Sequence, residues 1–250
     1  MPIITLHALS PKRQEAIRAL HALCRQAEPL TLSCPEDADA YWLYTDGADE
    51  LLSLLAAWQT EPGLWECCGF TRPDCRRQGY FYALLDAACG EGGILSQDDI
   101  LFVADGRSAD ADRALDALKA QPAGREHLME CPLSPLPQEA AALLSMAEKQ
   151  GLSLAFEENR VLLSGPGGRP LGSCRITSAG GQACLSSLMI EEARRGKGLG
   201  SCFLGLLLPA LANQGFSRLV LQVSGSNLPA LALYKKAGFR ITETLLYYLY

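Results

Sequence analysis

Apolar and polar positions alternate along the chain in a way that predicts a first series of helices and strands. Apolar residues at Ile17, Leu20 and Cys24 share one helical face, and Ser10 is placed to cap that helix. Short apolar runs separated by the turn sequences TDGADE and TEPG then predict strands. The expected helices are 11–27, 80–88 and 109–120, and the expected strands are 40–45, 51–58, 64–71 and 100–105.

A second series of elements follows the sequence CPLSPLPQ at 131–138. Three prolines in this segment cannot donate backbone hydrogen bonds, so we expect a linker rather than a helix or a central strand. Pro209 is expected to bend or end the helix that contains it. Beyond the linker we expect helices at 139–149, 198–213 and 229–237, and strands at 152–156, 160–164, 171–177, 183–190, 219–223 and 240–248.

The two series form an internal repeat. An offset of 119 residues sets Arg195 over Arg76 and Gly198 over Gly79, and it holds without a gap for about forty residues. The order of elements therefore predicts two tandem α/β units, each with a central, mostly antiparallel sheet flanked by helices. The expected domains are 1–130 and 139–250, joined by the linker at 131–138.

Composition narrows the class of function. The formal net charge of −6 argues against a nucleic-acid partner. Ten cysteines without a C-x-x-C pair, and an N-terminus without secretory features, predict reduced thiols in a cytoplasmic protein. The apolar stretch 203–211 is too short to span a membrane. His7, His21 and His127 all precede the second domain, which is therefore expected to lack both a histidine-based triad and a metal site.

The segment LMIEEARRGKGLGSCF, 188–203, carries the clearest candidate chemistry. A strand ends at Ile190, and glycines then open a helix whose free N–H groups suit a phosphate or pyrophosphate. Arg194, Arg195 and Lys197 add positive charge. A dinucleotide-binding motif would need a third glycine where Ser201 or Phe203 stands, and a P-loop would need Ser or Thr directly after the lysine. A tight strand-to-helix turn without a ligand is the remaining alternative.

A second segment, NLPALALYKKAGF at 227–239, predicts a short capped helix. Asn227 is a good N-cap and Pro229 suits the first turn. Leu231 and Tyr234 are three residues apart and share a face. Gly238 ends the helix.

These two segments, in this order, resemble the GNAT superfamily of N-acetyltransferases. The family pattern [QR]-x-x-G-x-[GA] is matched at 195–200, and N-x-x-A-x-x-L-Y-x-x-x-G-F is matched at 227–239. The resemblance covers about residues 150 to 250 well. It implies acetyl transfer from acetyl-CoA, without a metal, to an amine of a small molecule or peptide, in a monomer or homodimer. Tyr234 would be the general acid, and the acetyl-CoA-binding residues would be Ile190, Arg195, Gly196, Lys197, Gly198, Leu199, Gly200, Ser201 and Asn227.

No general base is evident, and Glu191 and Glu192 are as consistent with solvated loop charges. A non-catalytic acetyl-CoA or CoA sensor, or a regulatory module, is therefore the alternative function.

The first half departs from the family pattern. Phe81 stands where the last small residue is expected, Leu115 stands at the position of Tyr234, and Ser108 at that of Asn227. Leucine cannot donate a proton. The resemblance is thus to tandem GNAT proteins with one intact and one degenerate unit. We expect the first unit to be non-catalytic, with weak CoA binding or a part in shaping the acceptor site as its two open roles.

Overall fold

The computed structural model describes residues 3–250, without the side chain of Ala179. By its internal contacts the chain divides into two units. Unit 1 is Met1–Arg125 together with Leu245–Tyr250, and unit 2 is Glu126–Thr244. Each unit is a mixed α/β structure, as the sequence predicts.

The division between the units does not fall in the proline-rich segment. It lies inside strand β6 (Gln121–Pro132), and the segment 131–138 belongs wholly to unit 2. Cys131 and Pro132 are paired with Leu219 and Arg218, so the expected linker begins as part of a strand. Pro132 is tolerated because it is the last residue of that strand, where a missing N–H costs little.

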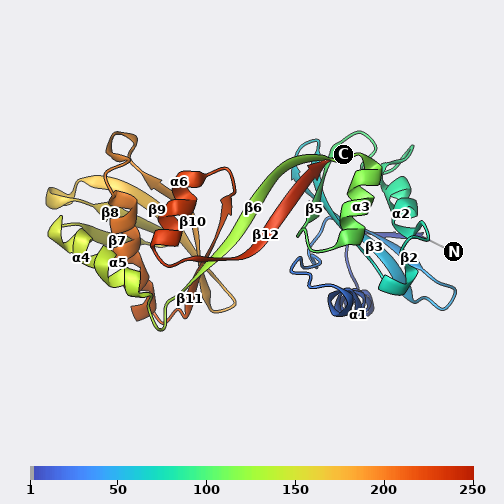
Figure 1. Ribbon diagram of the computed structural model, residues 1–250, viewed down its shortest axis with the longest axis horizontal. Coiled ribbons are helices and arrows are strands. Elements are labelled where there is room, and N and C mark those ends of the chain that lie inside the picture. Colours follow the sequence, from blue (N-terminus) through green and yellow to red (C-terminus); the bar gives the residue numbers. More distant parts are fainter. Residues whose placement is uncertain (1–2) are drawn as a thin grey trace. The chain divides into compact units, whose positions relative to one another are not determined.

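Unit 1 contains a sheet with the strand order β1-β2-β3-β4-β5 (Figure 1). Its strands are antiparallel except β4 and β5, which run parallel. Helix α1 packs on one face of the sheet, and α2 and α3 pack on the other. The elements are β1 (Ile3–Leu6), α1 (Pro11–Ala27), β2 (Ala40–Thr45), β3 (Leu51–Glu61), β4 (Leu64–Thr71), α2 (Tyr80–Cys89), β5 (Asp99–Ala104) and α3 (Ala109–Leu118).

Unit 2 contains a sheet with the strand order β6-β11-β10-β9-β8-β7 (Figure 1). Only β10 and β11 run parallel. Its core contains residues from all three helices of the unit. The elements after β6 are α4 (Gln138–Lys149), β7 (Ser153–Glu157), β8 (Arg160–Ser164), β9 (Pro170–Ala179), β10 (Gln182–Ile190), α5 (Leu199–Asn213), β11 (Arg218–Ser224), α6 (Leu228–Lys236) and β12 (Arg240–Leu249).

The last strand of each repeat completes the sheet of the other unit. Strands β6 and β12 begin 119 residues apart, at the offset of the repeat. Residues 246–249 of β12 pair antiparallel with 101–104 of β5 in unit 1. Residues 126–132 of β6 pair with 218–224 of β11 in unit 2. Each unit therefore depends on a strand that its own repeat does not supply.

Helix α5 continues past Pro209 to Asn213, the residue at which the sequence predicts its end. Four residues before Pro209 stands Gly205, where α5 lies directly against α4. A Cβ at Gly205 would lie 2.4 Å from the carbonyl carbon of Leu143. The glycine therefore allows the two helix backbones to approach each other closely.

Candidate functional site

Strands β10 and β11 are paired at one end and separate at the other. Their parallel ladder ends at Leu185 and Leu221, although the strands continue to Ile190 and Ser224. A β-bulge at the left-handed residue Ser187 (φ 52°) shifts the register of β10 against β9 in the separated part. This separation and bulge leave backbone groups of β10 without strand partners on the side of β11.

One such group is the N–H of Ile190. The next amide, that of Glu191, donates to Leu171 O on the β9 side at 2.9 Å. Because successive amides of a strand point in opposite directions, the N–H of Ile190 points away from β9 and toward the gap between β10 and β11.

The glycine turn after β10 ends in an uncapped helix N-terminus. Gly196 and Gly198 have φ of 74° and 77°, which only glycine adopts readily, and Gly198 is the N-cap residue of α5. No side chain caps this helix, and its first backbone bond is from Cys202 N to Gly198 O at 3.1 Å. The amides of residues 199–201 therefore lack helical acceptors and suit an anion.

The space in front of these amides is open. A Cβ built on Gly196 would meet no atom within 4 Å, and one on Gly198 would meet only Met146 Cε at 4.0 Å. Neither glycine packs tightly against another residue. They are therefore needed for their backbone angles and for leaving the turn accessible to a ligand.

Three cations surround the turn. Arg195 Nε donates to Ile190 O at 3.2 Å, and Lys197 Nζ donates to Ala193 O at 3.1 Å. Within the described part of the chain, neither these two nor Arg194 has an ion-pair partner. The site thus combines uncapped amides with unneutralised positive charge, as the binding of a diphosphate requires.

Helix α6 places a buried tyrosine in the core beside this site. Asn227 caps the helix, since its Oδ1 accepts a bond from Ala230 N at 3.2 Å. Leu233 packs on α5, because a Cβ at Gly200 would lie 3.0 Å from Leu233 Cδ2.

Tyr234 is 9% exposed and packs against Phe239, with ring centroids 5.5 Å apart. Burial, and to a smaller extent Cys174, raises the pKa of the Tyr234 phenol above its ordinary value. In the described residues no group forms a hydrogen bond with its hydroxyl. The phenol is therefore a proton donor that stays protonated at neutral pH.

The expectation that the second unit lacks a histidine is wrong. His127 lies on β6 inside unit 2, and its Nδ1 is 2.9 Å from Thr244 Oγ1. It pairs with Val223, two residues past the last β10–β11 pair, beside the separated strands. No local pattern indicates this position, because strand β6 begins in a segment without an apolar pattern and the prolines at 131–138 favour a boundary further along the chain.

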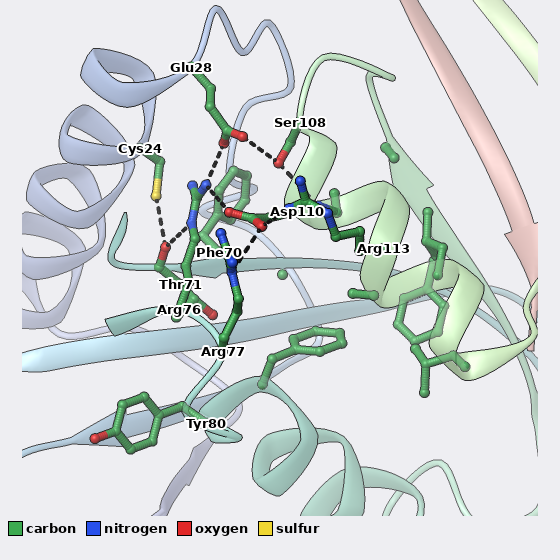
Figure 2. A pocket seen from close by; sticks show the side chains of 18 of the residues that line it. Cys24, Glu28, Phe70, Thr71, Arg76, Arg77, Tyr80, Ser108, Asp110 and Arg113 are labelled. Atoms are coloured by element: carbon green, nitrogen blue, oxygen red, sulfur yellow. Dashed lines mark hydrogen bonds and ion pairs between the residues drawn. The ribbon is translucent and has the colours of Figure 1, made fainter. Parts of the chain in front are cut away.

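Unit 1 keeps the backbone of this site and changes its chemistry. Arg76 Nε donates to Thr71 O at 3.2 Å, as Arg195 does to Ile190 O, and Gly79 (φ 85°) caps α2 as Gly198 caps α5. However, Arg76 Nη1 contacts Glu28 Oε2 at 2.8 Å and Asp110 Oδ2 at 3.2 Å (Figure 2). Carboxylates therefore occupy the surroundings of this arginine, whereas Arg195 in unit 2 has none.

Comparison with known proteins agrees with this geometry. Residues 122–239 match the sequence model of the acetyltransferase (GNAT) family. A mycothiol acetyltransferase of Clavibacter sepedonicus is 41% identical over 73 residues, covering 29% of this chain and 24% of the relative. The aligned part of the chain thus spans about a quarter of that relative's length.

Two solved structures share the fold of the whole chain. A GCN5-related N-acetyltransferase from Sphaerobacter thermophilus has a TM-score of 0.71 at 18% identity, covering 99% of this chain and 95% of that one. A tandem GNAT protein from the clavulanic acid biosynthesis pathway has a TM-score of 0.65 at 13% identity, covering 100% and 98%.

The chain thus forms two α/β units, and unit 2 carries an uncapped glycine turn beside a gap in its sheet. Residues 122–239 are thus similar to the acetyltransferase (GNAT) family, and the two-unit fold is similar to that of a tandem GNAT protein. None of the helices in the described residues is long and apolar enough to cross a membrane.

Proposed function

We propose that unit 2 is an acetyl-CoA-dependent N-acetyltransferase that acts on an amine of a small molecule or peptide. The observation that carries this proposal is the open, uncapped N-terminus of α5, flanked by three cations without ion-pair partners. The amides of residues 199–201, with Arg195 and Lys197, would hold the diphosphate of CoA. The amide side chain of Asn227 would bind the pantetheine arm in the gap between β10 and β11.

In this reaction the amine nitrogen attacks the thioester carbonyl carbon, forming a C–N bond as the C–S bond breaks. The Ile190 N–H would stabilise the negative charge that develops on the carbonyl oxygen. Tyr234 would give its phenolic proton to the departing thiolate. An ammonium substrate loses two protons: the one lost as the C–N bond forms restores the phenol of Tyr234, and the one lost before attack requires an acceptor.

His127 is our candidate for that acceptor. His127 is opposite Val223 of β11, so the two side chains share a face of the sheet, and Leu221, two residues earlier, shares it too. Leu221 is opposite Leu185 of β10, which is opposite Ile176 of β9, so this face continues across both strands. Cys174, two residues before Ile176, faces the same way, and after burial it is the second cause of the raised pKa of Tyr234. The imidazole and the phenol therefore lie on the same face of the sheet, beside the separated ends of β10 and β11.

Replacing His127 by Gln tests this role. We expect kcat/KM for the amine to fall by about tenfold or more at neutral pH. The defect should shrink as the pH approaches the pKa of the amine, because a neutral amine has already lost the proton. His7→Gln, in unit 1, is the control. Full activity of His127→Gln at neutral pH would exclude His127 as the acceptor.

Calorimetric titration with CoA tests the site itself. Gly198→Leu should weaken CoA binding by about tenfold or more, because the side chain would stand before the helix amides. Gly215→Leu is a matched control, since Gly215 has φ 90° and open space around its Cβ at the other end of α5. Both substitutions impose similar backbone strain, so equal CoA affinity in the two variants would refute the assignment.

A non-catalytic sensor of acetyl-CoA is the second candidate. It is favoured by the lack of an ionised carboxylate on β10. Release of free thiol from acetyl-CoA in the presence of a pooled amine library distinguishes the two functions, since a sensor would release none. Unit 1 would be non-catalytic in either case, because Leu115 stands at the position of Tyr234.

A further inference from the structure

A cavity in unit 1 is independent of the function proposed for unit 2. Its volume is about 490 Å³, within the range of small-molecule sites. It is lined by residues of α1, β4, α2, β5 and α3. The parallel ladder of β4 and β5 stops at Cys67 and Phe102 while the strands continue to Thr71 and Ala104. The cavity therefore occupies the gap between the separated ends of β4 and β5.

The residues around this cavity do not suit a diphosphate. Arg76 is already engaged by Glu28 and Asp110 (Figure 2). Arg77, at the left-handed position of Gly196, has a side chain where unit 2 has none (φ 61°). Phe81 replaces Gly200, and a Cβ on Gly69 of β4 would lie only 2.5 Å from its ring. A large ring and two carboxylates thus stand where unit 2 is open and positive.

These differences from unit 2 make the wall of the unit 1 cavity apolar and leave an empty volume inside it. Phe70, Phe81, Phe102 and Leu115 line the cavity. Ala114 also lines it and stands at the position of Leu233, which in unit 2 packs over Gly200. Unit 1 therefore has a large residue, Phe81, on α2 and a small one, Ala114, on α3. The empty volume of the cavity consequently lies beside α3. Such a wall favours a hydrocarbon body.

Three arginines and three carboxylates line the cavity, and the carboxylates already have hydrogen-bond or ion-pair partners. The carboxylate of Asp110 contacts Arg76, Arg77 and Arg113 (Figure 2). Burial opposes its ionisation, but the hydrogen bond from Arg76 and the neighbouring positive charges outweigh burial and lower the pKa of Asp110. Asp105, also at the cavity, accepts backbone bonds from Thr31 and from two further amides.

The arginines themselves keep donors. Arg77 and Arg113 have side chains that are 78% and 63% exposed, and Asp110 Oδ1 is the acceptor that both share. Each guanidinium has five N–H donors, so most of them remain available to a ligand.

We propose that the unit 1 cavity binds a small molecule with an apolar body and one carboxylate, of the fatty-acid class. The hydrocarbon body lies against Phe70, Phe102 and Leu115. The carboxylate accepts hydrogen bonds from Arg77 and Arg113.

Calorimetry of the full chain with decanoate, below its micellar concentration, tests this proposal. We expect one site per chain. Ala114→Phe should weaken binding by about tenfold or more by filling the cavity, and the double variant Arg77→Ser/Arg113→Ser should do likewise by removing the donors. Arg25→Ser, which removes one arginine charge at an exposed position of α1 outside the cavity, should leave binding unchanged. Circular dichroism verifies that each variant is folded.

Two further ligands test the specificity. Decylamine, with the same hydrocarbon chain and the opposite charge, should not bind, and CoA should not displace decanoate. The proposal is overturned if decanoate does not bind, if Ala114→Phe binds it normally, if decylamine binds equally well, or if CoA competes for the cavity. None of these results depends on whether unit 2 is catalytic.

Discussion

The substitution Tyr234→Phe removes the phenolic oxygen and keeps the ring, so it tests the role of the hydroxyl in catalysis without changing the packing of the side chain. The ring is 9% exposed and rests on Phe239, and Phe preserves both contacts. Since the hydroxyl has no hydrogen-bond partner in the described residues, its loss should change the free energy of unfolding by no more than about 1 kcal/mol. If the phenol protonates the leaving thiolate, turnover should fall by roughly 10²- to 10⁴-fold, or about 3 to 5 kcal/mol of activation free energy.

The assay is release of CoA thiol under saturating substrates, with thermal unfolding and CoA affinity measured on the same samples. Tyr248→Phe, a partly buried tyrosine of unit 1, is the control for removal of a phenolic oxygen. Because burial raises the pKa of Tyr234, wild-type turnover should lose this proton donor only above pH of about 10. Unchanged turnover in Tyr234→Phe, with normal CoA affinity, would refute its role as the general acid.

Two further predictions concern packing and topology. Gly205→Ala should destabilise unit 2 by about 1–3 kcal/mol in denaturant unfolding, because the new Cβ would meet the backbone of Leu143; an unchanged midpoint would contradict that close contact. Deletion of Leu245–Tyr250 should destabilise unit 1 by roughly 3 kcal/mol or more, because β5 loses its antiparallel partner and the core loses the partly buried ring of Tyr248. Hydrogen exchange should show faster exchange of β5 amides in the deletion variant with β11 protection retained, and equal loss of protection in both strands would refute the assignment of these residues to unit 1.

Local signals in the sequence were sufficient for most elements. Strands 40–45, 64–71 and 160–164 have the expected bounds, because short apolar runs between turn residues define strands locally. Ser10 caps α1 as expected, and its Oγ accepts a bond from Arg13 N at 3.4 Å. The glycine turn was also evident, since a left-handed N-cap requires a residue without a side chain.

Local signals do not predict which strands pair when they are far apart in the sequence. Strand β6 begins with QPAGRE, which lacks an apolar pattern, and it is held by its partners in the sheet. For this reason the domain boundary was expected at the prolines, and His127 was assigned to the wrong unit.

The sequence by itself determined the two repeats, the glycine turn and the phenol of Tyr234, because each depends on residues adjacent along the chain. The tertiary structure decided which strand completes which sheet, where the imidazole of His127 lies, and that the cavity of unit 1 is apolar with arginines at its edge. These features arise where residues far apart in sequence meet, and the side chains opposite one another in a sheet are set by the register of whole strands rather than by any local pattern.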